Sequence, residues 1–102
     1  MTIYTNNKYY EAILQLRPRN LALIKLTKDY IQDGNFLISK EIDKKFGIDL
    51  YLNNKKGAVN IARKLKKRFK GDIKLSRKLY SVDRMTSKRL WRVTVLFRLN
   101  EE

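Results

Sequence analysis

Hydrophobic and polar residues alternate along residues 9–17, and this period of two predicts a strand with one buried face. Pro18 follows and ends the strand, because proline has no backbone N–H to donate to a neighbouring strand. The side chains of the apolar face are Tyr10, Ala12, Leu14 and Leu16.

Two longer alternating runs predict a hairpin in the last third of the chain. The apolar face of its first strand carries Ile73, Leu75 and Leu79. After the polar turn 83–88, alternation resumes along 91–99, with Trp91 on the apolar side. We therefore expect Trp91 to lie in the core.

Spacings of three and four residues predict two amphipathic helices. The first begins after an Asn20 N-cap and ends at Gly34, a residue suited to a left-handed turn. It carries Leu21, Ile24, Tyr30 and Ile31. The second follows a cap at Asn53 or Asn54 and runs to Gly71. Its buried stripe consists of Ala58, Ile61, Ala62, Leu65 and Phe69.

Between the helices, residues 36–52 predict two short strands around the turn 43–47, with Ile38 and Ile42 facing inward on the first. The inward residues of the second are Ile48, Leu50 and Leu52. The element order is β-α-β-β-α-β-β. We expect an α/β (α+β) fold, a two-layer sandwich with two helices on one face of a mainly antiparallel sheet. A length of 102 residues predicts one domain over residues 1–102.

Positive charge is concentrated in the second half of the chain. Lys and Arg number 24 against 10 Asp and Glu, a net charge of +14. Residues 53–102 hold 16 basic and 4 acidic residues, and no acid occurs between Asp49 and Asp72. A solvated basic helix face is the plain interpretation. Such faces usually contain Glu as well, however, so its absence favours a polyanionic partner such as nucleic acid.

The absence of His and Cys excludes many enzyme classes. It removes the usual ligands of zinc, haem and iron–sulfur sites, and also a histidine base or a thiolate nucleophile. The internal carboxylates lack the strand spacing of a metal-dependent nuclease, and the four glycines form no phosphate-binding loop. We therefore predict no catalysis and no cofactor. Lack of Cys, of a signal peptide and of a membrane-spanning run predicts a cytoplasmic protein without membrane contact.

Three surfaces compete as the binding site. The turn 53–57 is either a plain N-cap or a phosphate site made of free N–H groups, the helix dipole and two lysines. The outer face of the second helix suits a sequence-independent contact with a phosphate backbone. The open sheet face mixes cations, hydroxyls and aromatics, which suits stacking of unpaired bases, although an exposed face must be polar in any case. The predicted nucleic-acid-binding residues are Lys55, Lys56, Arg63, Lys64, Lys67, Lys70, Lys74, Lys78, Arg84, Lys88 and Arg92.

Four segments, taken in order, resemble the archaeal form of the NMD-three (NMD3) family. They are YYEAILQLR (9–17), FGIDLYL (46–52), LSRKL (75–79) and RVTVLFRL (92–99), and they span nearly the whole chain. The GIDLY and SxKL elements are the most specific. The resemblance is to the family's middle domain, which is related in shape to a small eukaryote-type protein of the large ribosomal subunit.

Members of this family bind the intersubunit side of the large ribosomal subunit and, in eukaryotes, act as its nuclear-export adaptor. The resemblance therefore implies ribosomal RNA and ribosomal proteins as partners and a non-enzymatic role. Full members also carry an N-terminal array of Cys-x-x-Cys zinc sites and a further β-rich domain, whereas this chain has no Cys. We expect an excised domain or a reduced relative, and we do not carry over the export function.

We predict a non-catalytic RNA-binding module of the large ribosomal subunit or its assembly, acting through the basic helix and hairpin. Its partners would be ribosomal RNA or other structured RNA, and proteins of the large subunit. Two alternatives stay open. One is a double-stranded DNA-binding protein of chromatin or viral type. The other is a protein-interaction domain that docks a partner on an open sheet edge or on Ile13, Leu90 and Leu96.

Overall fold

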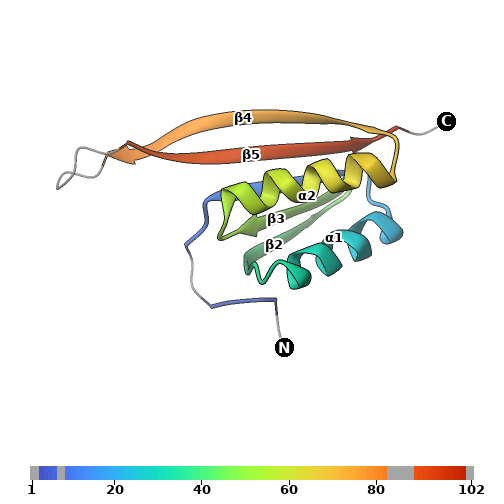
Figure 1. Cartoon of the computed structure of the whole chain (residues 1–102), viewed down its shortest axis with the longest axis horizontal. Coiled ribbons are helices and arrows are strands. Elements are labelled where there is room, and N and C mark those ends of the chain that lie inside the picture. The colour runs from blue at the N-terminus through green and yellow to red at the C-terminus, as the bar shows by residue number, and fades with distance from the viewer. Residues whose placement is uncertain (1–2, 7–8, 83–88, 101–102) are drawn as a thin grey trace.

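The computed structural model describes residues 3–6, 9–82 and 89–100, with the backbone alone at 79–82 and 89–90. Its elements are β1 (Ala12–Arg17), α1 (Leu21–Asp33), β2 (Ile38–Lys44), β3 (Gly47–Leu52), α2 (Lys55–Arg68), β4 (Gly71–Val82) and β5 (Arg89–Leu99). Both helices cover the same face of the sheet (Figure 1). The predicted element order and the two-layer α/β sandwich are confirmed.

The five strands form one sheet in the order β2-β3-β1-β5-β4. The first and last strands, β1 and β5, run parallel, and the other neighbours are antiparallel. Leu14 of β1 pairs with Leu50 on one side and with Val95 on the other, and all three side chains are fully buried. The core therefore lies between the middle of the sheet and the helices, and β2 and β4 form the two edges.

The two helices begin where their caps predict, and most of their buried residues are those expected. Asn20 and Asn54 are the N-caps, and each accepts a hydrogen bond from the third residue after it. The buried residues of α2 include Ala58, Ile61, Ala62 and Leu65, and those of α1 are Leu23, Ile24, Thr27 and Ile31. α2 ends at Arg68, and Gly71, its predicted end, is the first residue of β4.

Two details of α1 differ from the prediction. Leu21 is 79 % exposed, because it lies about 100° around the helix from the centre of the buried stripe. Gly34 follows the helix with a φ of −85°, and the left-handed residue is Asn35 with a φ of 58°. Asn tolerates this conformation better than most residues. Gly34 instead leaves room for the Phe36 ring, against which a Cβ at this position would collide.

The inward position predicted for Ile42 is wrong. The register of β2 against β3 shifts between Ile38 and Lys40, so Ile38 pairs with Leu52 whereas Ile42 pairs with Asp49. Paired residues share a face, and a shift of one residue moves every later side chain to the other face. Ile42 therefore lies on the open face, half-buried, and Ile38 alone enters the core from this strand.

The hairpin of β4 and β5 is longer than the helix layer that covers it, and it extends past the N-terminal end of α2 (Figure 1). Val93, Val95 and Phe97 lie under the helices and are buried. Trp91 alternates in phase with these residues but is 40 % exposed. Leu75 is 51 % exposed as well, although its partner Val95 is buried, because Leu75 lies on the edge strand β4. The predicted core position of Trp91 is therefore wrong, because too little helix surface covers this part of the hairpin.

Candidate nucleic-acid interface

The structure divides the predicted cations between the two faces of the sheet. On the helix side, the exposed cations are Lys55, Lys56, Arg63, Lys64, Lys67 and Lys70. Lys74, Lys78 and Arg92 lie on the opposite face, where Lys78 pairs with Arg92 and Lys74 pairs with Leu96. The cations of the helix and those of the open sheet face, which we had expected as two separate surfaces, therefore lie on opposite sides of the sheet. Arg84 and Lys88 lie outside the described residues.

The start of α2 is a capped helix end whose backbone donors are partly occupied. The Asn54 side chain accepts a hydrogen bond from the Gly57 N–H at 2.8 Å. The Glu11 carboxylate accepts one from the Lys55 N–H at 3.1 Å. A carboxylate is the kind of group that the positive end of a helix dipole attracts. The turn 53–57 therefore offers an anion mainly the side chains of Lys55 and Lys56.

The cations of α2 have no carboxylate partners in the part of the chain that the structure describes. The ion pairs there are Arg17–Asp49, Arg19–Asp43, Lys28–Glu41 and Lys44–Asp49. On the helix, like charges four residues apart, such as Arg63 and Lys67, repel each other by a few tenths of a kcal/mol. α2 therefore presents a positive potential that the described carboxylates do not neutralise.

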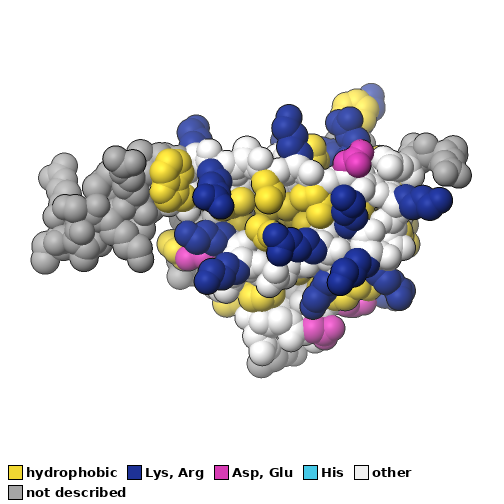
Figure 2. All heavy atoms as spheres, turned by 45° about the horizontal axis from the view of Figure 1, so that its top comes forward, with side chains coloured by type: hydrophobic (Ala, Val, Ile, Leu, Met, Phe, Trp, Pro, Cys, Tyr) yellow, Lys and Arg dark blue, Asp and Glu magenta, His cyan; other side chains and the backbone are white. Residues whose placement is uncertain are grey.

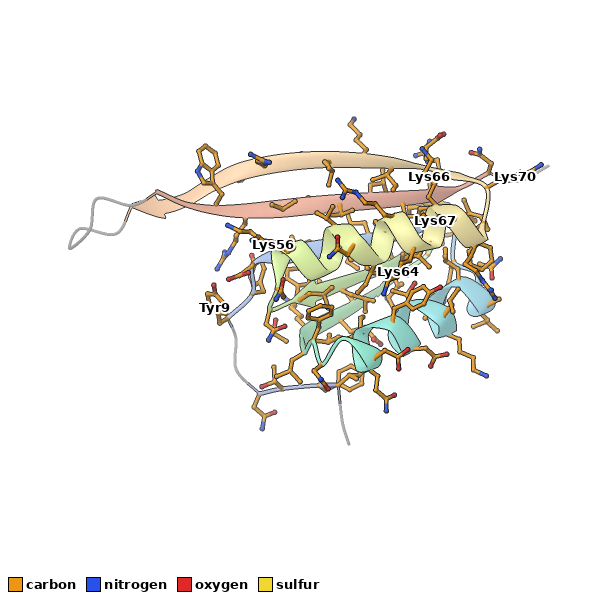
Figure 3. All side chains as sticks on the ribbon, in the orientation of Figure 1. Tyr9, Lys56, Lys64, Lys66, Lys67 and Lys70 are labelled. Carbon is orange, nitrogen blue, oxygen red and sulfur yellow. The ribbon has the colours of Figure 1, made fainter. Side chains whose placement is uncertain are left out.

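The α2 cations surround the exposed side of the helix. Figure 3 shows Lys66 pointing toward the hairpin and Lys64 toward α1. The Lys64 ammonium lies 5.3 Å from the centre of the Tyr30 ring, a cation–π distance. Lys66 was not among the predicted site residues, although it is exposed and belongs to the same acid-free segment.

A groove of about 410 Å³ lies between α2 and the strands β4 and β5, and we call it the α2–hairpin groove. Its lining residues are Lys55, Lys56, Val59, Asn60, Arg63, Arg77, Trp91 and Val93. In Figure 2, hydrophobic side chains are visible in the middle of this side of the molecule, and Lys and Arg side chains surround them. The groove therefore combines an apolar floor with a cationic rim.

Five residues of the groove were not among the predicted site residues: Val59, Asn60, Arg77, Trp91 and Val93. Arg77 pairs with Val93, so it lies on the helix side of the hairpin. The sequence did contain a signal for it, because Arg77 has the same parity as Ile73 and Leu75 and is the one cation on that apolar face. Trp91 was assigned to the core because it alternates with the polar residues of the strand. This alternation does not indicate how far the helices extend over the hairpin.

Cations on the open face of the sheet interact with the protein itself. The Arg92 guanidinium lies 3.8 Å from the centre of the Tyr10 ring and donates to the Tyr10 hydroxyl at 3.0 Å. The apolar-face position predicted for Tyr10 is therefore wrong, because Tyr10 precedes the first residue of β1 and its ring lies against Arg92 and Tyr51. The Lys40 ammonium lies 5.6 Å from the centre of the Tyr51 ring. Lys74, Lys78 and Arg98 are exposed on this face. The open face is thus basic too, but two of its cations stack on tyrosines of the chain.

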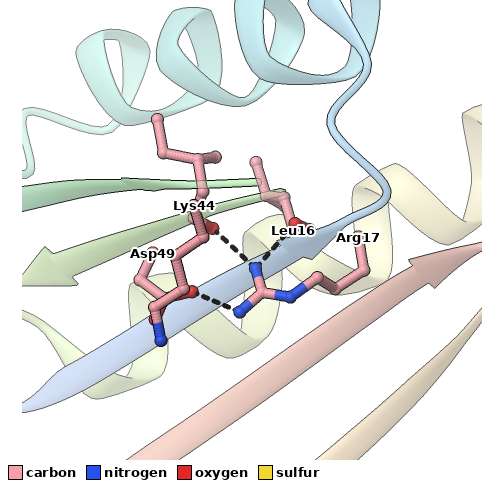
Figure 4. A network of polar contacts seen from close by, with 5 residues as sticks. Leu16, Arg17, Lys44 and Asp49 are labelled. Atoms are coloured by element: carbon pink, nitrogen blue, oxygen red, sulfur yellow. Dashed lines mark hydrogen bonds and ion pairs between the residues drawn. The ribbon is translucent and has the colours of Figure 1, made fainter. Parts of the chain in front are cut away.

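Asp49, within the GIDLY segment, joins three strands (Figure 4). Its carboxylate, 4 % exposed, lies 2.7 Å from Arg17 Nη2 and 3.1 Å from Lys44 Nζ. The Arg17 Nη1 atom also donates to the backbone oxygens of Leu16 at 2.9 Å and Ile48 at 3.3 Å. The acidic residue of the GIDLY segment therefore has a structural role, because it links β1, β2 and β3.

A second ion pair connects α1 to β2. The Lys28 ammonium lies 3.0 Å from Glu41 Oε1, which also accepts a hydrogen bond from the Tyr4 hydroxyl at 2.9 Å. Burial lowers the pKa of Lys28, but hydrogen bonds and attraction to Tyr4 and Glu41 raise it by more, so the pKa lies above its ordinary value. The positive charge of Lys28 therefore stabilises the contact between α1 and β2.

None of the helices in the described part of the chain has the length and apolar character needed to cross a membrane. Among the same residues, no three acidic side chains come together in a way that could hold a metal ion.

The sequence model of a protein family, described as NMD3, second domain, matches residues 9–99. A search of curated proteins finds no match. The matched range contains all four segments that carry the resemblance, and it includes every helix and strand of the fold.

Proposed function

The chain belongs to the NMD3 family, whose members are non-catalytic adaptors for export of the large ribosomal subunit, and we propose that this domain binds RNA of that subunit through α2. The observation that carries the proposal is the set of exposed α2 cations without carboxylate partners among the described residues. Such a surface lowers its electrostatic free energy when a polyanion supplies the missing charge.

The dimensions of α2 suit contact with a phosphate backbone. From Lys56 to Lys67 the helix rises by about 16 Å, at about 1.5 Å per residue. Lys56, Arg63 and Lys67 lie along the side of α2 that faces away from the core, so they can contact successive phosphates. Contacts of this kind supply affinity and orientation without reading a base sequence. The module would therefore act by positioning itself on folded RNA, with proteins of the large subunit as neighbours.

Two alternative functions are distinguished by experiment. Duplex DNA carries the same phosphate charge and would compete with structured RNA for α2. A protein partner would instead use an open sheet edge or the apolar part of the open face, where Ile13 and Leu96 are half-buried. The side chain of Leu90, the third residue of that alternative, lies outside the described part of the structure. A protein-docking role would be insensitive to charge reversal on α2.

The proposal is tested with two charge-reversal variants that carry the same change in net charge. The first replaces Arg63, Lys64 and Lys67 with Glu on α2. The second, a matched control, replaces the exposed residues Lys74, Lys78 and Arg98 with Glu on the open face. We expect the first to weaken binding to large-subunit ribosomal RNA fragments at least tenfold more than the second, because only the first removes direct phosphate contacts.

The assay is fluorescence anisotropy at low salt, with duplex DNA added as a competitor. Circular dichroism checks that both variants are folded. An equal loss in the two variants would mean that net charge alone attracts the RNA. Competition by duplex DNA as strong as by RNA would favour the DNA-binding alternative.

A further inference from the structure

We infer that the α2–hairpin groove holds one unpaired nucleotide of the bound RNA, with its base stacked on Trp91 and its flanking phosphates at Lys56, Arg63 and Arg77. The inference rests on the proposed function and adds the kind of RNA that the site takes. That RNA has a bulged or otherwise extruded base beside a folded region.

Trp91 is placed as a stacking surface. Its side chain is 40 % exposed and lines the groove, because the hairpin extends beyond the helix layer. Trp is highly buried on average, so an indole that is partly exposed in a hollow offers an unusually accessible aromatic face for a ligand. Aromatic side chains stack any base, because every base has a π-face.

The remaining lining matches the other parts of a nucleotide. Val59 and Val93 extend the apolar floor beside Trp91, where the flat faces of a base avoid water. Asn60, exposed on α2, provides an amide donor and acceptor for a base edge. The charged residues of the lining are all cations: Lys55, Lys56, Arg63 and Arg77. A base and its phosphates therefore find complementary chemistry within one groove.

A fully paired duplex uses less of this groove. Its bases are stacked and paired, so it presents phosphates to the cations and leaves the indole exposed to water. Single-stranded and bulged positions expose the faces of their bases, and sequence-specific recognition of RNA uses such positions. The apolar floor is thus explained by an extruded base and not by a duplex backbone.

The chain contains a built-in probe of this contact, because Trp91 is its one tryptophan. Three RNA hairpins are compared that are identical except for one position: fully paired, with a single-nucleotide bulge, or with an abasic bulge. We expect the bulged hairpin to quench Trp91 fluorescence and to bind about 5- to 150-fold more tightly than the paired one. The abasic hairpin should lose both effects.

Substitutions separate stacking from structure. Trp91→Leu should remove the preference for the bulged hairpin, and Trp91→Phe should retain most of it. Phe46→Leu serves as a control, because Phe46 is 71 % exposed and does not line the groove. Anisotropy of labelled RNA gives the affinities, and circular dichroism checks folding. Because Trp91 is partly exposed, the Leu variant should remain folded.

The outcomes distinguish this inference from the proposed function. If bulged and paired hairpins bind alike and Trp91 fluorescence does not change, the inference is overturned. The proposed function still stands in that case if reversal of the α2 charges weakens binding. Absence of RNA binding at low salt overturns both. Quenching by an acidic peptide but by none of the RNAs overturns the inference and makes a peptide the occupant.

Discussion

Replacing Asp49 with Asn removes the carboxylate that connects β1, β2 and β3. In the native protein it lies 2.7 Å from Arg17 Nη2 and 3.1 Å from Lys44 Nζ, and it is 4 % exposed. The variant keeps the size of the side chain and one oxygen acceptor, so packing is hardly altered. What changes is that the guanidinium loses its charged partner while its other hydrogen bonds hold it in place.

The expected cost follows from burial. Breaking a fully buried ion pair costs about 3–5 kcal/mol, and a hydrogen bond to a charged group contributes about 1.5–3 kcal/mol. The Arg17 side chain is 19 % exposed, so water partly solvates the unpaired charge. Lys44 is half exposed and adds little. We therefore expect a loss of about 2–3 kcal/mol in the free energy of unfolding, which for a domain of this size lowers Tm by about 10 °C.

Thermal and urea denaturation followed by circular dichroism measure this loss. Asp72→Asn is the matched control, because Asp72 is exposed on β4 and the substitution should change stability by less than about 0.5 kcal/mol. Combining Asp49→Asn with Arg17→Met should cost clearly less than the two single losses added together, since the partners are coupled. Equal stabilities of Asp49→Asn and Asp72→Asn would refute the structural role of this carboxylate.

Two further predictions concern close packing and pH. Gly47→Ala should lower the free energy of unfolding by about 1–3 kcal/mol, as measured by urea denaturation. The new Cβ would collide with the backbone oxygen of Leu16, which cannot move aside as a side chain can. An unchanged free energy of unfolding would contradict this close approach. For Lys28, a folded-state pKa above the ordinary value of 10.5 means that its contribution is fully present below that pH and is lost as pH rises through the raised pKa. The free energy of unfolding of the native protein should therefore exceed that of Lys28→Met by a constant amount from pH 7 to 10, and the two values should converge at higher pH. A difference that does not change with pH would contradict the ion pair.

Much of the fold could be predicted because local patterns determine it. The N-caps Asn20 and Asn54, the strand end at Pro18 and the stripe of α2 are all encoded within a few residues. The position of Ile42 could not be predicted, because a register shift near Ser39 depends on the pairing of two strands. A pattern with a period of two says which residues share a face, but not where a bulge exchanges the faces.

The candidate site shows the same limit. The cations of α2 were evident from an acid-free segment, whose helical period places them around the exposed side. The groove was not evident, because it depends on how far α2 extends along β4 and β5. That length difference exposes Trp91. The groove brings Arg77 and Trp91 of the hairpin together with Lys55 and Lys56 of α2, from which both are distant in sequence. The alternation of the strands, in contrast, placed Lys74, Lys78 and Arg92 on the open face of the sheet, and the strand register agrees with that placement.

The most direct test of RNA binding through α2 is the salt dependence of affinity for large-subunit ribosomal RNA. If α2 and the groove contact about five phosphates, log affinity should fall against log salt with a slope of about −3.5 to −4.5. The variant with Glu at positions 63, 64 and 67 should have a slope that is less steep by about 2 or more, and the open-face control should keep the native slope. A native slope near zero, or the same slope in all three proteins, would contradict the account.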